Sequence, residues 1–212
     1  MSRIRQYPGT LLIIGIALVC NYELIFGLEG RLVELLELKS VKVTSGEIWR
    51  LVAGNFVHIS AGHFWIDLTA ISVLGFLYEK EMGWYWAGLI LVASLLIGLV
   101  FCFYVDRLDL YRGLSGTAHG CFAAALVLEY RLTRKSRIRR SLILLISAGF
   151  IWKVVYETIS GQFFWAMSQD TALMGLPVPE AHLTGAVTGF LYALLFVAFR
   201  AKGRENSTVG NS

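Results

Sequence analysis

The chain has 212 residues, of which 56% are hydrophobic and 16% are charged, well below the roughly 25% of charged residues in soluble domains. With a mean hydropathy of +0.62, this composition excludes an ordinary soluble domain and indicates one all-α membrane domain. The net charge of +4 is unevenly spread, because the run RLTRKSRIRR (131–140) holds six basic and no acidic residues. Since this run lies between two apolar segments, it indicates membrane topology and not nucleic-acid binding.

Six segments approach the length of about 20 mostly apolar residues that a spanning helix needs. The first starts in MSRIRQYPGTLLIIGIALVC, which resembles a signal peptide. No small-x-small cleavage site follows, so we expect a retained helix. The fourth segment spans about 24 Å, less than the hydrocarbon core of about 30 Å, so one of its ends should lie below the membrane surface. The six predicted helices are 8–28, 60–79, 83–105, 115–130, 141–160 and 181–200.

The basic residues predict the orientation of these helices. Lys and Arg gather before the first helix, in 131–140 and after the sixth helix. With six helices these three segments fall on one side, which the positive-inside rule makes cytoplasmic. Residues 1–202 would then form a single domain with both termini in the cytoplasm, and 203–212 would be a disordered cytoplasmic tail. The amphipathic stretch RLVELLEL (31–38) is expected at the outer interface.

Two polar residues are predicted to meet near the outer face. Ser115 begins the fourth helix and His182 begins the sixth. Both helices run from outside to inside, so the two side chains lie at similar depth. Each helix also carries two glycines four residues apart, a spacing that lets helix backbones approach closely. If the glycine faces pack together, Ser115 and His182 come within hydrogen-bond reach. The glycines are Gly116, Gly120, Gly185 and Gly189.

The Ser115 and His182 pair has two interpretations. A serine hydroxyl is a poor nucleophile until a base accepts its proton. A histidine at about 2.6–3.2 Å can be that base and can then return the proton to a leaving amine. The alternative is an inter-helix hydrogen bond that holds the two helices together.

The second helix contributes further ionisable groups from NFVHISAGHFWIDLTAI (55–71). His63 and Asp67 are four residues apart and share a helix face, while His58 precedes the helix. All four histidines of the chain fall on the outer side, and ionisable groups within a membrane point to function. In one hypothesis, His63 and the Ser115 backbone N–H stabilise the charge on an attacked carbonyl. In another, the histidines and Asp67 bind a metal, although no HExxH motif is present.

His58 has a simpler alternative role as a cap of the loop that precedes the second helix. We expect no metal and no other cofactor.

Three motifs together resemble the signatures of rhomboid intramembrane serine proteases. They are WRLVAGNFVHISAGHFWID (49–67), GLSG (113–116) and AHLTG (181–185), and the resemblance covers about 50–200. It implies a six-helix rhomboid-like bundle.

By position, the same resemblance makes Ser115 the nucleophile and His182 the general base. The Ser115 backbone N–H and His63 would form the oxyanion hole, and Gly113 would give the backbone room around the nucleophile.

Asp67 departs from this family pattern, which has asparagine at its position. An amide can donate a hydrogen bond to an oxyanion, and an ionised carboxylate cannot. Either Asp67 is protonated, or it holds His63 as a cation whose second N–H remains a donor. We favour the second hypothesis.

Three further residues resemble the rhombosortase branch of the family. His119 stands where many rhomboids have a tyrosine that stacks on the catalytic histidine, and Lys153 and Glu157 form a Lys-x-x-x-Glu pair late in the fifth helix. This pair either contacts the polar segment of a substrate or is an ordinary i,i+4 ion pair.

Rhombosortases process exported bacterial proteins that end in Gly-Gly, an apolar helix and basic residues. The resemblance implies an intramembrane serine endopeptidase that acts through an acyl-enzyme in the bacterial inner membrane, with its active site open to the periplasm. Its partners would be transmembrane C-terminal tails of exported proteins and membrane lipid. The alternatives are a general rhomboid protease with other single-pass substrates and a catalytically silent client-binding protein.

Overall fold

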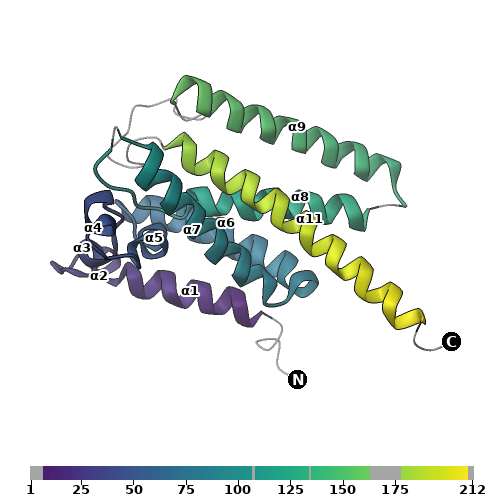
Figure 1. Ribbon diagram of the computed structural model, residues 1–212, viewed down its shortest axis with the longest axis horizontal. Coiled ribbons are helices and arrows are strands. Elements are labelled where there is room, and N and C mark those ends of the chain that lie inside the picture. Colours follow the sequence, from purple (N-terminus) through teal and green to yellow (C-terminus); the bar gives the residue numbers. More distant parts are fainter. Residues whose placement is uncertain (1–6, 107, 134, 163–177, 210–212) are drawn as a thin grey trace.

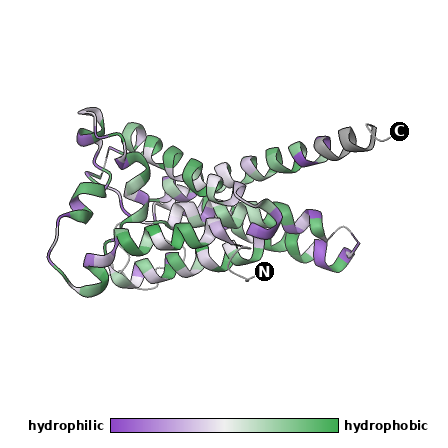
Figure 2. Cartoon of the chain, turned by 90° about the horizontal axis from the view of Figure 1, so that it is seen from below, coloured by the Kyte–Doolittle hydropathy of each residue, from purple (hydrophilic) through white to green (hydrophobic). Residues whose placement is uncertain are grey.

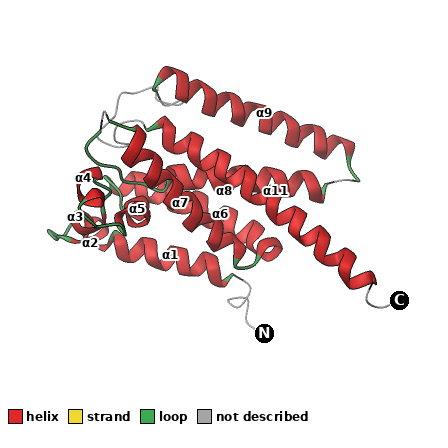
Figure 3. Cartoon of the chain, viewed as in Figure 1, coloured by secondary structure: helices red, strands yellow, loops and turns green. Residues whose placement is uncertain are grey.

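A computed structural model describes residues 7–106, 108–133, 135–162 and 178–209, with side chains described up to residue 202. Within these ranges the regular structure is helical, apart from one isolated antiparallel bridge between Leu38 and Tyr111 (Figure 3). The long helices run roughly along one common axis (Figure 1). They are α1 (Pro8–Cys20), α6 (Ala61–Met82), α7 (Tyr85–Tyr104), α8 (Ser115–Leu132), α9 (Arg137–Ser160) and α11 (Pro179–Val209).

The first predicted helix is broken at Asn21. α1 ends at Cys20 and a separate short helix, α2 (Tyr22–Phe26), follows. The Asn21 side-chain amide donates to the carbonyl of Ala17, four residues earlier, and to the carbonyl of Phe56. Such side-chain bonds compete with the helical ladder, so the helix stops there and not at residue 28 as predicted. Gly27, with φ of 64°, then ends α2 in the left-handed conformation.

Short helices between α2 and α6 gather at one end of the bundle (Figure 1). The predicted amphipathic stretch forms α3 in this region. An ion-pair network ties the region to the loop before α8, because buried Glu37 accepts hydrogen bonds from Arg112 and from Lys39. Burial raises the pKa of Glu37, but the hydrogen bonds outweigh burial and lower it overall. The short helices are α3 (Leu32–Leu36), α4 (Ser40–Thr44), α5 (Arg50–Ala53) and η2 (Gly54–Phe56).

Four of the described helices are long and apolar enough to cross a membrane: α6, α7, α9 and α11 up to Lys202. Figure 2 shows hydrophobic residues along these helices and hydrophilic residues mainly towards the ends of the bundle. The remaining two predicted spans do not reach these limits. α1 has 13 residues, and α8 begins and ends with polar residues. The structure therefore makes the chain a multi-pass membrane protein, and the count of six spans stays a prediction.

The central helix α8 packs against α6, α7, α9 and α11. Its closest approach is to α11, where the glycines meet. A Cβ added to Gly185 would lie 1.8 Å from the carbonyl oxygen of Gly116, and one added to Gly189 would lie 1.8 Å from that of Gly120. No side chain fits in either gap. The predicted contact between the two glycine faces is present.

Several helix ends differ from the predicted ones. α9 starts at Arg137 and not at residue 141, because the Ser136 hydroxyl caps it by accepting from the Arg139 N–H. α11 extends to Val209, beyond the predicted end at residue 200 and into the predicted tail. Ala, Lys, Arg and Glu after the apolar part favour helix, and a helix that has already started continues through them. Residues 210–212 of the predicted tail lie outside the described residues.

Candidate functional site

Ser115 is the first residue of α8, and the loop before it is held by several hydrogen bonds. Gly113 has φ of 125°, a conformation that favours glycine. Its N–H donates to the Gly54 carbonyl at 3.3 Å, and the Leu114 N–H donates to His58 Nε2 at 3.3 Å. Ser115 therefore lies at a fixed helix N-terminus, where backbone N–H groups lack helical partners and the helix dipole is positive.

His182 of α11 faces Ser115. The distance between His182 Nε2 and Ser115 Oγ is 3.2 Å, and the histidine is 5% exposed. The close packing of the glycines on α8 and α11 produces this approach, as their spacing predicts.

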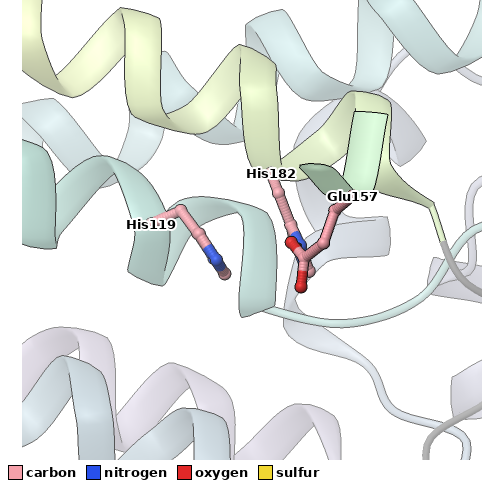
Figure 4. Close-up of side chains that lie close together, drawn as sticks. All are labelled: His119, Glu157 and His182. Atoms are coloured by element: carbon pink, nitrogen blue, oxygen red, sulfur yellow. The ribbon is translucent and has the colours of Figure 1, made fainter. Parts of the chain in front are cut away.

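The second nitrogen of His182 contacts α9, an interaction that the sequence did not predict. His182 Nδ1 lies 2.8 Å from Glu157 Oε2, and Glu157 is 2% exposed. Lys153 Nζ is 2.8 Å from the same carboxylate oxygen and 2.8 Å from His119 Nε2. His119 Nδ1 in turn lies 2.7 Å from the Ser115 carbonyl oxygen. Figure 4 shows His119, Glu157 and His182 close together.

These contacts determine which ring nitrogen of His119 and of His182 carries the proton. Lys153 can only donate, so His119 Nε2 must accept and Nδ1 carries the proton that His119 donates to the Ser115 carbonyl. A Glu157 carboxylate accepts from Lys153 and from the Nδ1–H of His182. The lone pair of His182 Nε2 then faces the Ser115 hydroxyl. This is the tautomer that a general base requires.

The imidazole rings of His119 and His182 also stack. Their centroids are 3.9 Å apart and their planes are inclined by 13°, and His119 stacks in addition on Phe150 of α9. His119 therefore restrains the ring plane of His182, in the place that the sequence assigned to it.

A second cluster surrounds Asp67 of α6. Asp67 Oδ2 lies 3.3 Å from His58 Nε2 and 3.2 Å from His63 Nε2. The edge of His63 borders the loop before Ser115, because a Cβ added to Gly113 would lie 3.0 Å from His63 Cε1. His63 Nδ1 is buried and has no hydrogen-bond partner among the described residues.

His58 holds the loop in place. His58 Nδ1 lies 3.2 Å from Asn21 Oδ1 and donates to it, and Nε2 lies 3.3 Å from both the Leu114 nitrogen and Asp67 Oδ2. Burial lowers the pKa of His58 and outweighs the opposing effect of Asp67, which agrees with a neutral ring. This geometry fits the alternative that His58 is a loop cap. No sequence motif had drawn attention to Asn21.

The histidines divide between these two clusters, in contrast to the hypothesis that they join Asp67 around one metal. In the part of the chain with described side chains, the group with metal-ligand chemistry is His119, Glu157 and His182, whose ligand atoms all lie within 4.8 Å of one another. The Lys153 ammonium already donates to two of the three. A metal ion would have to compete with this positive charge.

An apolar groove of about 520 Å³ runs between α8, α9 and α11. Three of its lining residues, Phe150, Val154 and Leu183, adjoin the cluster that contains His182. The groove therefore brings an apolar surface up to the Ser115 and His182 pair.

Comparison with known protein families agrees with this geometry. The model of the Rhomboid domain matches residues 45–199, a region that contains Ser115, His182 and the Asp67 cluster. A search of curated proteins gave no match. Because the matched region covers more than half of the chain, this multi-pass membrane protein belongs to the rhomboid family.

Proposed function

We propose that this protein is an intramembrane serine endopeptidase in which Ser115 is the nucleophile and His182 the general base. The observation that carries the proposal is the 3.2 Å approach of His182 Nε2 to Ser115 Oγ. It occurs at a helix N-terminus inside a membrane bundle of the rhomboid family, whose members are generally proteases of this class.

The reaction follows from this geometry. Ser115 Oγ bonds to the carbonyl carbon of the scissile peptide while its proton passes to His182 Nε2. The tetrahedral intermediate then collapses, the C–N bond breaks, and His182 gives the proton to the leaving amine. An acyl-enzyme on Ser115 remains. Water, activated by the same histidine, releases the acyl group and restores the serine.

The negative charge on the attacked carbonyl oxygen needs donors that are already in place. We assign this role to the Ser115 backbone N–H at the N-terminus of α8 and to His63 Nδ1. His63 can donate from Nδ1 while bonded to Asp67 through Nε2 only if both nitrogens carry protons. In this proposal Asp67 balances the charge of a protonated His63.

Asp67→Asn is expected to keep substantial cleavage activity and to change its dependence on pH. The asparagine amide can itself donate a hydrogen bond, while the charge that supports a protonated His63 is lost. Initial rates of reporter cleavage in proteoliposomes across a pH series measure both effects. Complete loss of activity in a variant with unchanged thermal stability would refute the idea that asparagine can substitute here.

The topology that we propose has six spans with both termini in the cytoplasm. α1 together with α2 forms the first span, and α8 forms the fourth. α8 is short and has polar residues near both ends, and its neighbouring helices enclose it. The site at the start of α8 and α11 then opens towards the periplasm of a bacterial inner membrane. The support is the basic run at 131–140, which covers the end of α8, the connection to α9 and the start of α9.

For the substrate, we propose a transmembrane C-terminal tail with Gly-Gly at its outer end. The residues of the rhombosortase-like pattern support this proposal, because His119, Lys153 and Glu157 all lie around His182. The prediction that the charged pair contacts the polar segment of a substrate stays part of this proposal, and the Lys153 side chain is 22% exposed. A helical peptide bond is shielded, and glycine lowers the cost of unwinding by roughly 1 kcal/mol per residue relative to alanine.

Co-expression with a Gly-Gly-tailed reporter tests this function. Wild type is expected to release the soluble reporter, and Ser115→Ala is expected to leave it in the membrane. A matched reporter with Ala-Ala in place of Gly-Gly should be cut more slowly. Equal cleavage of both reporters favours the general rhomboid alternative. Stable association of an uncut reporter with wild type favours the client-binding alternative.

A further inference from the structure

We infer that Glu157 is a positioning residue that converts the Ser115 and His182 pair into a Ser–His–Glu triad. The inference deepens the proposed function and rests on it. Three helices then build the site: α8 supplies the serine, α11 the histidine and α9 the acid.

The first support is the geometry of the acid. Glu157 Oε2 meets His182 Nδ1 at 2.8 Å, on the opposite side of the ring from the nitrogen that faces Ser115. Serine, imidazole and carboxylate thus follow in one hydrogen-bonded chain. Geometry of this kind, and not sequence order, defines a triad.

The second support is the burial of a charged group. Glu157 is 2% exposed in a helix that is apolar enough to cross a membrane. A buried carboxylate is costly unless it is paired and hydrogen-bonded. Lys153, one turn earlier on α9, supplies the counter-charge at 2.8 Å. This lysine also donates to His119, which stacks on His182. The Lys153 ammonium therefore holds both side chains that contact the His182 ring on this side, Glu157 and His119.

The third support is that His182 needs a tautomer that the pair alone does not select. An imidazole can carry its single proton on either nitrogen, and with the proton on Nε2 it cannot accept from Ser115. A carboxylate at Nδ1 selects the productive tautomer and stabilises the imidazolium that forms during the reaction. The other carboxylate near the site, Asp67, contacts His58 and His63 instead.

Glu157→Gln tests the inference through the rate at which a fluorophosphonate probe acylates Ser115 in the purified full chain. The isosteric amide can donate to His182 Nδ1 and favour the wrong tautomer. We expect the maximal acylation rate to fall by about 10²–10⁴-fold, with little change in the probe concentration that gives half-maximal rate. The matched control is Glu129→Gln on α8, where the carboxylate accepts from the Tyr78 hydroxyl, away from the site. The control should label at the wild-type rate.

A spectroscopic readout separates positioning from a general structural role. The chain has four histidines, so ¹⁵N-histidine labelling gives few ring signals. Ser115→Ala should retain a strongly hydrogen-bonded Nδ1–H proton signal of His182, and Ser115→Ala with Glu157→Gln should lose it.

The outcomes distinguish the two proposals. Unchanged acylation in Glu157→Gln, or a signal that persists in the double variant, overturns the triad while leaving the protease intact. A rate loss that appears as weaker probe binding together with lower thermal stability also contradicts positioning. Absence of Ser115-dependent labelling in wild type contradicts the proposed function itself.

Discussion

His182→Ala is expected to lower the rate of reporter cleavage by about 10³–10⁶-fold, as removal of the general base does in known serine proteases. Each tenfold loss corresponds to about 1.4 kcal/mol of transition-state stabilisation. The physical reason is that Ser115 then has no base to accept its proton. The measurement is the single-turnover cleavage rate at saturating enzyme.

The control for this variant is His119→Tyr, which keeps an aromatic ring in the position that stacks on His182. This variant loses the hydrogen bonds of His119 but keeps His182, so we expect its cleavage rate to fall by about tenfold or less. If His182→Ala kept more than a tenth of the wild-type rate in a folded protein, His182 would not be the base. The hydrogen bond to Ser115 would then belong to the alternative of helix packing.

Gly185→Ala is expected to cost both stability and activity. Its new Cβ would lie 1.8 Å from the Gly116 carbonyl oxygen, a backbone atom that no rotamer change can move away. α11 must shift by more than 1 Å relative to α8, and overpacking of this kind costs typically 1–3 kcal/mol or more. Because Ser115 and His182 sit on these two helices, a displacement of that size costs on the order of 10²-fold in rate.

Gly149→Ala on α9 is the matched control, because no atom of the described residues lies within 4 Å of its added Cβ. Thermal unfolding in detergent, followed by tryptophan fluorescence, and the cleavage rate are measured for both variants. Gly149→Ala should unfold at or slightly above the wild-type temperature, since alanine favours helix over glycine. A Gly185→Ala variant with wild-type stability and rate would contradict the close contact of α8 and α11.

The Ser115 and His182 pair could be predicted from the sequence because two simple signals agree, namely the positions of the basic loops and the spacing of the glycines. Basic loops predict the direction of each helix, and glycines at a spacing of four predict the faces that pack. Both signals depend on general physics of membrane helices. The pair is therefore accessible without coordinates.

The contact between His182 and Glu157 was not predictable in the same way. Lys153 and Glu157 show on the sequence only that they share a face of the fifth helix. Whether that face turns towards lipid, substrate or His182 depends on how α9 packs, which no local pattern encodes. Asn21 was missed for the same reason, because its effect on α1 comes through hydrogen bonds to a carbonyl 35 residues away and to His58.

Labelling with a fluorophosphonate probe, followed by peptide mass spectrometry, shows directly whether Ser115 is the nucleophile. We expect a covalent adduct on Ser115 of the wild type, no adduct in Ser115→Ala, and much slower adduct formation in His182→Ala. A protein that cleaves the reporter without forming this adduct, or that keeps cleaving as Ser115→Ala and stops when a chelator is added, would contradict it.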